Sequence, residues 1–211
     1  MVNQSYFYSR FSFQKERENV WKVLTRYLQK DIPVSSKILE LGCGYCDFIN
    51  NIIALEKHAI DLFEGIKDYA HPDVYLHFQS ATEMSNFSDE SFDVVFASNF
   101  FEHLGLDEFE KTIKHVVRIL KKGGKLIIIQ PNFKYAYKEY FDDFTHRLIF
   151  TEVSLSDFLK SQGLKIKRVI PKFIPFSMKS KLPKWTFLIK IYLYLPIKPF
   201  ARQMLIIAEK S

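Results

Sequence analysis

The stretch "ILELGCGYCDF", Ile38 to Phe48, decides the fold. It is an apolar run that ends in a glycine-rich turn, Gly42-Cys43-Gly44, and a segment with helical spacing follows. In a doubly wound α/β sheet, ligands bind at such a strand–turn–helix, beyond the carboxyl end of the strand. Glycines at this place let the backbone approach a ligand closely. The stretch therefore predicts a parallel α/β sheet with a cofactor loop.

The remainder of the chain alternates between strand and helix patterns. Short apolar runs predict strands, and 3.6-residue periodicity predicts helices. This alternation is typical of βαβ units with right-handed crossovers. The predicted strands are 36–42, 58–64, 74–80, 91–99, 125–131, 164–170 and 203–210; the predicted helices are 13–30, 45–55, 106–122 and 151–163, and 171–200 is expected to be irregular.

The spacing of the loop separates several cofactor classes. A dinucleotide loop reads G-x-G-x-x-G, and counting from Gly42 the third glycine is replaced by Asp47. An acid in the first helical turn would also repel a pyrophosphate. No Walker loop occurs in the sequence. A cofactor without phosphates fits better, with Asp61 at the end of the second strand as the carboxylate for its ribose.

Several motifs together resemble the class I S-adenosylmethionine-dependent methyltransferases. In the first motif of that family, usually E/D-x-G-x-G-x-G, Glu40, Gly42 and Gly44 match and Cys46 replaces the last glycine. "SATEM" (80–84) resembles the segment beside the adenine, "FDVVFASNFFEHL" (92–104) the fourth-strand motif, and "LKKGGKLIIIQPN" (120–132) the next one. The similarity covers roughly residues 35–135. "YFDDFTHR" and "PKFIPFSMKSKLP" more loosely resemble a bacterial subgroup associated with sugar or polysaccharide biosynthesis.

The resemblance implies a Rossmann-like, doubly wound α/β fold. Its seven-stranded sheet would be mostly parallel with an antiparallel last strand, preceded by an N-terminal helix. A basic insertion would separate strands six and seven. All 211 residues would form a single methyltransferase domain: a helical cap at 1–34, a cofactor-binding core at 35–135, and the acceptor-side loop, insertion and last strands at 136–211.

The resemblance also implies S-adenosylmethionine as the cofactor and S-adenosylhomocysteine as its product. Asp61 matches the ribose-binding acid, and Ser80 stands where the family often has an acid that recognises the adenine. Leu62 and Ala81 would pack against or bond the adenine. The expected cofactor-binding residues are Glu40, Gly42, Cys43, Gly44, Asp61, Leu62, Ser80, Ala81 and Asn99.

The acceptor side is less defined by the sequence. A methyltransferase must hold the acceptor in line with the methyl group and exclude water. A hydroxyl acceptor must also lose a proton, which favours a general base or a metal. The candidate catalytic residues are His103, after the fourth strand, and Asn132, Asp143 and His146, after the fifth.

Each candidate also has a structural interpretation. The turn at His103 can cap a helix or pack below the cofactor, and Asn132 can belong to a turn. Asp142, Asp143 and His146 can cap the helix that starts near residue 151 or form ion pairs. Three such residues in one loop do not predict a metal site, so no metal is expected.

Cys43 and Cys46 are the only cysteines. A zinc site would need two further ligands, and no second pair is present. We interpret the two thiols as small side chains in a tight turn. With no disulfide framework, no signal peptide pattern and no run of about 18 apolar residues, we expect a cytoplasmic protein.

The net charge of +6 is unevenly distributed. Residues 165–202 contain ten lysines and arginines and no acid, so this segment carries +10 and the remainder carries −4. "KWTFLIKIYLYLP" (184–196) within it resembles an interfacial helix, which indicates an anionic surface on the inner face of the membrane. A basic surface loop or a dimer contact would explain the same pattern. Nucleic acid is disfavoured because no RNA-binding module is visible.

We therefore expect a methyltransferase that acts on a small-molecule or glycan acceptor, lipid-linked or phosphorylated. An RNA or quinone-type acceptor is an alternative within the enzyme class. A non-catalytic binding protein that keeps the fold is the alternative outside it.

Overall fold

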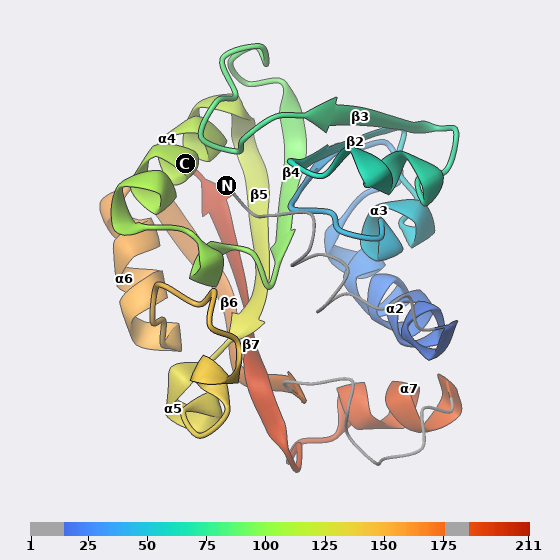
Figure 1. The fold of residues 1–211 in the computed structure, drawn as a ribbon, viewed down its shortest axis with the longest axis vertical. Coiled ribbons are helices and arrows are strands. Elements are labelled where there is room, and N and C mark those ends of the chain that lie inside the picture. The colour runs from blue at the N-terminus through green and yellow to red at the C-terminus, as the bar shows by residue number, and fades with distance from the viewer. Residues whose placement is uncertain (1–14, 176–185) are drawn as a thin grey trace.

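A computed structural model describes residues 15–175 and 186–211. Their strands form one seven-stranded sheet in the order β3-β2-β1-β4-β5-β7-β6 (Figure 1). Strand β7 is antiparallel to both β5 and β6, and the other pairs are parallel. This confirms the predicted sheet. The strands are β1 Lys37–Leu41, β2 Glu56–Asp61, β3 Val74–Phe78, β4 Phe92–Ser98, β5 Leu120–Pro131, β6 Leu164–Pro175 and β7 Ala201–Lys210.

Helices cover both faces of the sheet, with α2 and α3 on one side and α4 and α6 on the other (Figure 1). The helices are α2 Lys15–Leu28, α3 Asp47–Asn51, α4 Leu106–Ile119, α5 Phe133–Ala136, α6 Glu152–Ser161 and α7 Thr186–Tyr194. Short 3-10 turns lie between them: η1 Gln29–Asp31, η2 Glu64–Asp68, η3 Phe101–His103 and η4 Tyr140–Asp142.

Strand β1 is buried on both faces, as its continuous apolar sequence predicts. Because side chains alternate along a strand, Ile38 packs in the core under α2 and α3, whereas Leu39 and Leu41 pack in the core under α4 and α6. All three are fully buried. The loop that follows β1 is therefore held at the centre of the sheet, at its carboxyl edge.

Two predicted helices end earlier than the sequence indicated. The helix expected at 45–55 spans only Asp47–Asn51, because Ile52 is extended and the chain turns towards β2. The helix expected at 106–122 ends at Ile119, because Leu120 pairs with Phe92 and begins β5. In both cases the start of the neighbouring strand decides where the helix stops.

The region expected to be irregular, 171–200, contains regular structure in its described parts. Strand β6 continues to Pro175 with register shifts after Ile170, and α7 forms at Thr186–Tyr194. Residues 176–185 lie outside the described ranges. Helix α7 packs against α2, where the rings of Tyr27 and Tyr194 lie 5.6 Å apart.

Candidate functional site

The loop after β1 keeps the geometry of a three-glycine loop although it has only two glycines. Gly42, Gly44 and Cys46 have φ angles of 64°, 52° and 59°, all in the left-handed region. A side chain in this region is strained, so glycine is the usual residue there. Cys46 stands where the family motif has its last glycine, and its small side chain is fully buried. The substitution therefore preserves the shape of the loop.

Asp61, at the end of β2, is tied directly to this loop. Its Oδ2 accepts a hydrogen bond from the Gly44 N–H at 3.0 Å, and its Oδ1 accepts one from the Phe63 N–H at 3.0 Å. Burial raises the pKa of Asp61 against these backbone hydrogen bonds, which lower it. A carboxylate has about four acceptor positions, so these backbone hydrogen bonds leave acceptor capacity for a ribose hydroxyl.

Gly42 and Gly44 differ in what surrounds them. A Cβ built on Gly44 would have no atom of the described residues within 4 Å. A Cβ on Gly42 would lie 2.4 Å from Cδ2 of Phe100, so the Phe100 ring covers Gly42 directly. Gly42 and Phe100 thus form a wall between the cofactor loop and η3.

Glu40 lies beneath the loop rather than facing that space. It is 4% exposed, and its Oε2 accepts a hydrogen bond from the Ile49 N–H at 3.1 Å. Burial, together with the neighbouring Cys46, raises the pKa of Glu40 well above its ordinary value. The contact joins β1 to α3 and fixes the loop between them.

The two cysteines are buried and reduced, with their Sγ atoms 3.8 Å apart. The contact with Cys46, together with burial, raises the pKa of the Cys43 thiol. Cys43 is therefore not activated as a thiolate.

Asp47 needs a different interpretation from the one its sequence position indicated. Its carboxylate pairs with the Arg17 guanidinium of α2 at 2.6 Å. The acid in the first turn of α3 is therefore compensated by a cation, and charge repulsion alone does not exclude a pyrophosphate.

The other predicted cofactor residues lie at the carboxyl ends of β2, β3 and β4. Leu62 is 62% exposed beside Asp61, and Ala81 is buried. The Ser80 hydroxyl lies 2.8 Å from that of Thr82. Asn99 has a left-handed φ of 48° and donates its N–H to the Ile129 carbonyl at 2.8 Å. Their roles in binding stay predictions.

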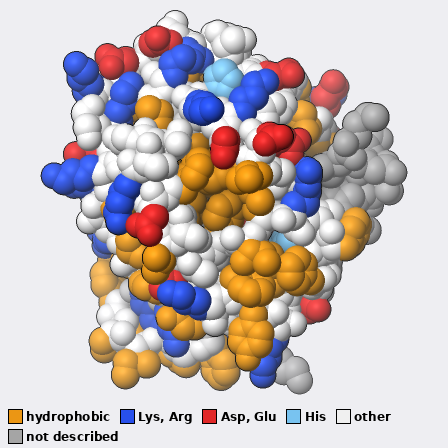
Figure 2. Space-filling model, turned by 90° about the vertical axis from the view of Figure 1, so that its left-hand side faces the viewer, with side chains coloured by type: hydrophobic (Ala, Val, Ile, Leu, Met, Phe, Trp, Pro, Cys, Tyr) orange, Lys and Arg blue, Asp and Glu red, His pale blue; other side chains and the backbone are white. Residues whose placement is uncertain are grey.

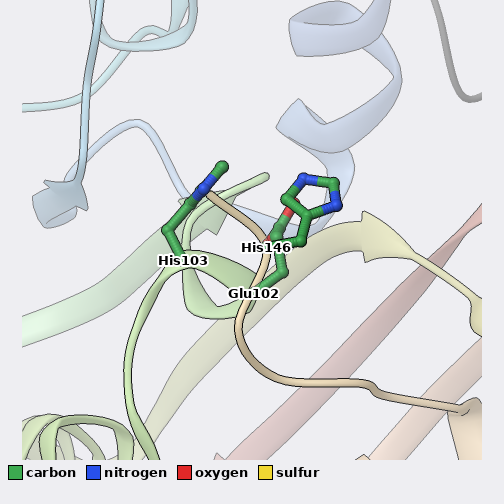
Figure 3. Close-up of side chains that lie close together, drawn as sticks. All are labelled: Glu102, His103 and His146. Carbon is green, nitrogen blue, oxygen red and sulfur yellow. The ribbon is translucent and has the colours of Figure 1, made fainter. Parts of the chain in front are cut away.

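Three side chains that can bind a metal or a proton meet on the acceptor side (Figure 3). Glu102 and His103 come from η3, directly after the wall formed by Gly42 and Phe100, and His146 comes from the loop before α6. One ligating atom from each lies within 4.8 Å of the other two. The backbone holds the two loops together, since the Glu102 carbonyl accepts hydrogen bonds from the Arg147 and Leu148 N–H groups at 2.7 and 3.1 Å.

Burial shifts the protonation of this group. It raises the pKa of Glu102 to about 8, and the nearby Asp143 adds to the rise. It lowers the pKa of His103 to about 4, with a smaller effect of His146. At neutral pH the imidazole of His103 is therefore neutral and holds an extra proton poorly, which makes it a weak general base.

The predicted catalytic residues therefore lie at two different places in the structure. His103 and His146 come together, with ring centroids 4.9 Å apart. Asp143 supports them from one side: its Oδ1 accepts from the Thr145 hydroxyl at 2.7 Å, and that hydroxyl contacts His103 Nδ1 at 2.9 Å. Glu102 was not among the predicted residues, although it lies in the stretch 92–104 that resembles the fourth-strand motif of the family.

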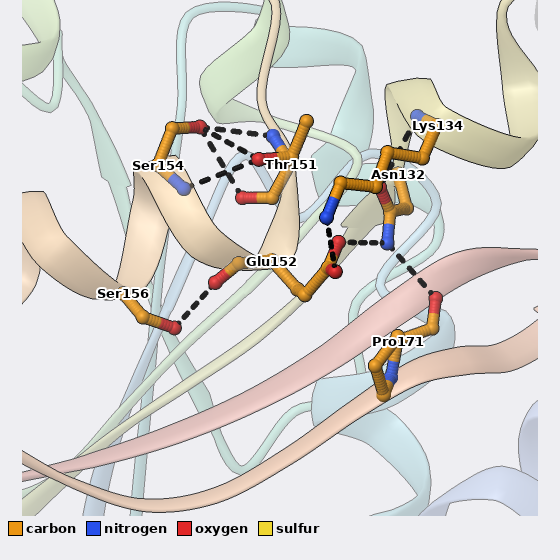
Figure 4. Close-up of polar contacts among 7 residues, drawn as sticks. All are labelled: Asn132, Lys134, Thr151, Glu152, Ser154, Ser156 and Pro171. Carbon is orange, nitrogen blue, oxygen red and sulfur yellow. Dashed lines mark hydrogen bonds and ion pairs between the residues drawn. The ribbon is translucent and has the colours of Figure 1, made fainter.

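Asn132 has a different position, in a buried network at the end of β5 (Figure 4). Its amide donates to Glu152 Oε2 at 2.8 Å and to the Pro171 carbonyl at 3.1 Å, and its Oδ1 accepts from the Lys134 N–H at 3.3 Å. The side chain is fully buried. It therefore joins β5, α6 and β6 and caps α5, which is a structural role.

Comparison with known proteins agrees with this geometry. Residues 39–128 match the family described as a methyltransferase domain. Phosphoethanolamine N-methyltransferase of Plasmodium falciparum is 26% identical over 61% of this chain and 54% of its own length. An uncharacterized protein of Methanocaldococcus jannaschii is 31% identical over 61% of this chain and 55% of its own. The chain spans about half the length of these curated relatives.

Solved structures share the whole fold. A SAM-dependent methyltransferase of Archaeoglobus fulgidus superposes with a TM-score of 0.67 at 20% identity, covering 90% of this chain and 94% of that one. One of Thermotoga maritima gives 0.68 at 20% identity, covering 92% and 91%. A Pyrococcus horikoshii protein gives 0.67 at 17% identity and covers both chains completely. Residues 39–128 are therefore similar to a methyltransferase domain, and the chain has the fold seen in solved structures of SAM-dependent methyltransferases.

Proposed function

We propose that the protein is a SAM-dependent methyltransferase. The observation that supports this most is the loop of three left-handed residues, closed onto Asp61 by the Gly44 N–H, within a methyltransferase domain. In the reaction the S–CH3 bond breaks and its electron pair stays on sulfur. A new bond forms from the acceptor heteroatom to the methyl carbon, and the proton of that heteroatom leaves.

The acceptor site lies beyond Phe100, at Glu102, His103 and His146. We propose a hydroxyl-bearing small molecule or glycan, because neutral imidazoles accept hydrogen bonds from hydroxyl groups. Figure 2 shows the face on which α6 lies, where hydrophobic side chains gather between charged ones. An apolar part of the acceptor, such as a lipid anchor, would suit that surface. The exposed apolar residues on and near the acceptor-side loop are Leu106, Phe141, Phe144, Ile149 and Val153.

A phosphorylated amine is the second candidate acceptor. It is favoured by the similarity to a protein named phosphoethanolamine N-methyltransferase. Incubation with labelled S-adenosylmethionine and either phosphoethanolamine or a panel of sugars and polyprenol-linked glycans would separate the two classes. Methylation of phosphoethanolamine alone would overturn the hydroxyl acceptor.

Cofactor binding can be tested by thermal unfolding. Ligand at 100 times its Kd stabilises a folded protein by about 2.7 kcal/mol. We expect S-adenosylmethionine and S-adenosylhomocysteine to raise the Tm of the wild type. They should have little effect on Asp61→Ala, while Asp157→Ala, which removes an exposed acid of α6, should respond as the wild type does. If neither ligand raises the wild-type Tm, the proposed function is wrong.

We further propose that α7 lets the protein rest on an anionic membrane surface. Its inner side holds the buried Leu193, whereas Phe187, Ile191 and Tyr194 are exposed around the exposed Lys190. Apolar side chains beside a cation are typical of an interfacial helix. In the described residues of the basic segment, however, Lys167, Arg168 and Arg202 pair with acids, so its charge is partly compensated. No helix in the described part of the chain is long and apolar enough to cross a membrane.

Co-sedimentation with phosphatidylglycerol vesicles would test this surface. We expect the wild type to sediment at low salt and Ile191→Glu to remain in the supernatant. Val34→Glu, at an exposed apolar residue outside α7, is the matched control and should sediment. Equal sedimentation of both variants would exclude α7 as the contact.

A further inference from the structure

The group Glu102, His103 and His146 contains a buried acid whose charge has no counterpart. Glu102 is fully buried, and neither of its side-chain oxygens has a hydrogen-bond partner among the residues that the structure describes. An uncompensated carboxyl group in such a place costs free energy unless it meets a cation or keeps its proton. The buried carboxyl group of Glu102 is therefore a candidate ligand for a cation.

The hydrogen bonds of both histidines set which ring nitrogen carries a proton. His146 Nδ1 lies 2.6 Å from the Tyr140 carbonyl, which can only accept, so Nδ1 carries the hydrogen. His103 Nδ1 lies 2.9 Å from the Thr145 hydroxyl, which itself donates to Asp143, so this Nδ1 is also a donor. In both rings the lone pair is then on Nε2.

This arrangement is typical of metal ligands. A histidine that binds a metal through one nitrogen almost always donates the other N–H to a carbonyl, hydroxyl or carboxylate, which fixes the ring. One ring nitrogen of each histidine and one oxygen of the buried carboxyl group, from three residues on two loops, lie within 4.8 Å of one another. Metal–ligand bonds of about 2.0–2.2 Å would draw these atoms together through side-chain rotation.

We propose that Glu102, His103 and His146 bind one divalent transition-metal ion, such as Zn²⁺ or Fe²⁺. Two imidazoles and one carboxylate favour such an ion over Mg²⁺ or Ca²⁺, which prefer oxygen ligands. Glu102 gives up its proton to solvent as the ion binds. Three protein ligands leave coordination positions open for a hydroxyl oxygen.

The role of this ion rests on the proposed function. A metal-bound hydroxyl would be more acidic, so its proton would pass to solvent water as the oxygen forms its bond to the methyl carbon and the S–CH3 bond breaks. The ion would lie on the opposite side of the Gly42–Phe100 contact from the cofactor loop, where we propose that the acceptor binds.

Metal binding is measurable without cofactor or turnover. Full-length protein stripped with a chelator would be titrated with Co²⁺, followed by visible absorption, and its Zn²⁺ content measured after equilibrium dialysis. We expect one ion per chain, with d–d absorption of a nitrogen and oxygen site. Glu102→Gln, nearly the same in shape, and His146→Ala should weaken binding at least tenfold. His71→Ala, which removes an exposed histidine, should bind as the wild type does.

The outcomes separate the two proposals. Asp61→Ala should keep the metal and lose the cofactor, and Glu102→Gln should keep the cofactor and lose the metal. Circular dichroism of each variant shows that it is folded. If the wild type binds no ion, or if folded Glu102→Gln and His146→Ala bind Co²⁺ as tightly as the wild type, the metal site is overturned whatever the result for S-adenosylmethionine.

Discussion

The ring of Phe100 lies directly on the backbone of Gly42, so close that a Cβ there would stand 2.4 Å from Cδ2. The contact joins the cofactor loop to the turn that carries Glu102 and His103. A shift of either element would move the other. Gly42 is therefore required both for its left-handed φ of 64° and for the absence of a side chain.

Gly42→Ala should destabilise the protein by about 2–5 kcal/mol, since strain at a left-handed residue costs about 1–2 kcal/mol and overpacking costs about 1–3 kcal/mol. Gly163→Ala is the matched control: φ is 84° and a Cβ would meet no atom within 4 Å, so only the strain of about 1–2 kcal/mol applies. Urea unfolding measures both, and adding Phe100→Ala to Gly42→Ala should recover part of the loss. Equal losses of unfolding free energy in Gly42→Ala and Gly163→Ala would show that the Phe100 ring can move aside without a cost in stability.

Glu40 should make the stability depend on pH. Its pKa is raised in the folded state by burial, so the folded protein holds a proton that the unfolded chain loses above about pH 4.5. Stability therefore falls as the pH rises through this window, by up to about 1.4 kcal/mol per pH unit. Glu40→Gln keeps an oxygen for the Ile49 N–H and should lose this slope.

Chemical unfolding between pH 4.5 and 8 would measure the slope, with Glu83→Gln, at an exposed acid, as the baseline. Glu40→Gln should gain stability relative to the wild type as the pH rises. Parallel curves for wild type and Glu40→Gln would mean that the folded protein carries Glu40 ionised.

Asn132→Ala should destabilise the protein by about 2–4 kcal/mol, because it leaves buried partners at Glu152 and Pro171 unsatisfied. Lys134→Ala, which removes only the ion pair with Glu152 at a half-exposed side chain, should cost less than about 1 kcal/mol. Thermal unfolding compares the two. Unchanged stability of Asn132→Ala with lost turnover would instead support the catalytic role that its position in the sequence indicated.

Thr145→Val should weaken metal binding about ten- to a hundredfold, the usual effect of removing a group that orients a metal-binding histidine. The substitution keeps the shape of the side chain and removes the hydroxyl between His103 and Asp143. Thr82→Val, at the end of β3, is the control. Co²⁺ titration of both variants gives the comparison. An unchanged affinity of Thr145→Val for Co²⁺ would mean that the Thr145 hydroxyl does not orient the His103 ring.

The sheet could be predicted because each strand is a short apolar run that ends at a turn. The positions of Gly42, Gly44 and Asp61 were predictable for the same reason: all three follow strand ends, and parallel strands bring such ends to one edge. Their role in binding a cofactor stays a prediction. The ends of α3 and α4 could not be predicted, since pairing with neighbouring strands sets them. Local helical periodicity at Leu120 carries no information about Phe92.

The acceptor half depends on contacts that no local pattern contains. His146 reaches Glu102 because the Arg147 N–H bonds to the Glu102 carbonyl across two loops. The sequence grouped His146 with Asp142 and Asp143, its neighbours in the chain. Likewise, nothing in the sequence indicated a partner for Asp47, whereas in the structure its carboxylate forms an ion pair with Arg17 of α2.

The position of β6 indicates a second role for the basic residues of this strand, apart from binding an anionic surface. This strand lies at one of the two edges of the sheet, where backbone groups could pair with a strand of another molecule. Pro171 and Pro175 offer no N–H there, the register shifts after Ile170, and the exposed Lys165 and Lys172 would repel a second copy of the same edge. Replacing these residues with apolar ones should make the domain prone to aggregate through this edge.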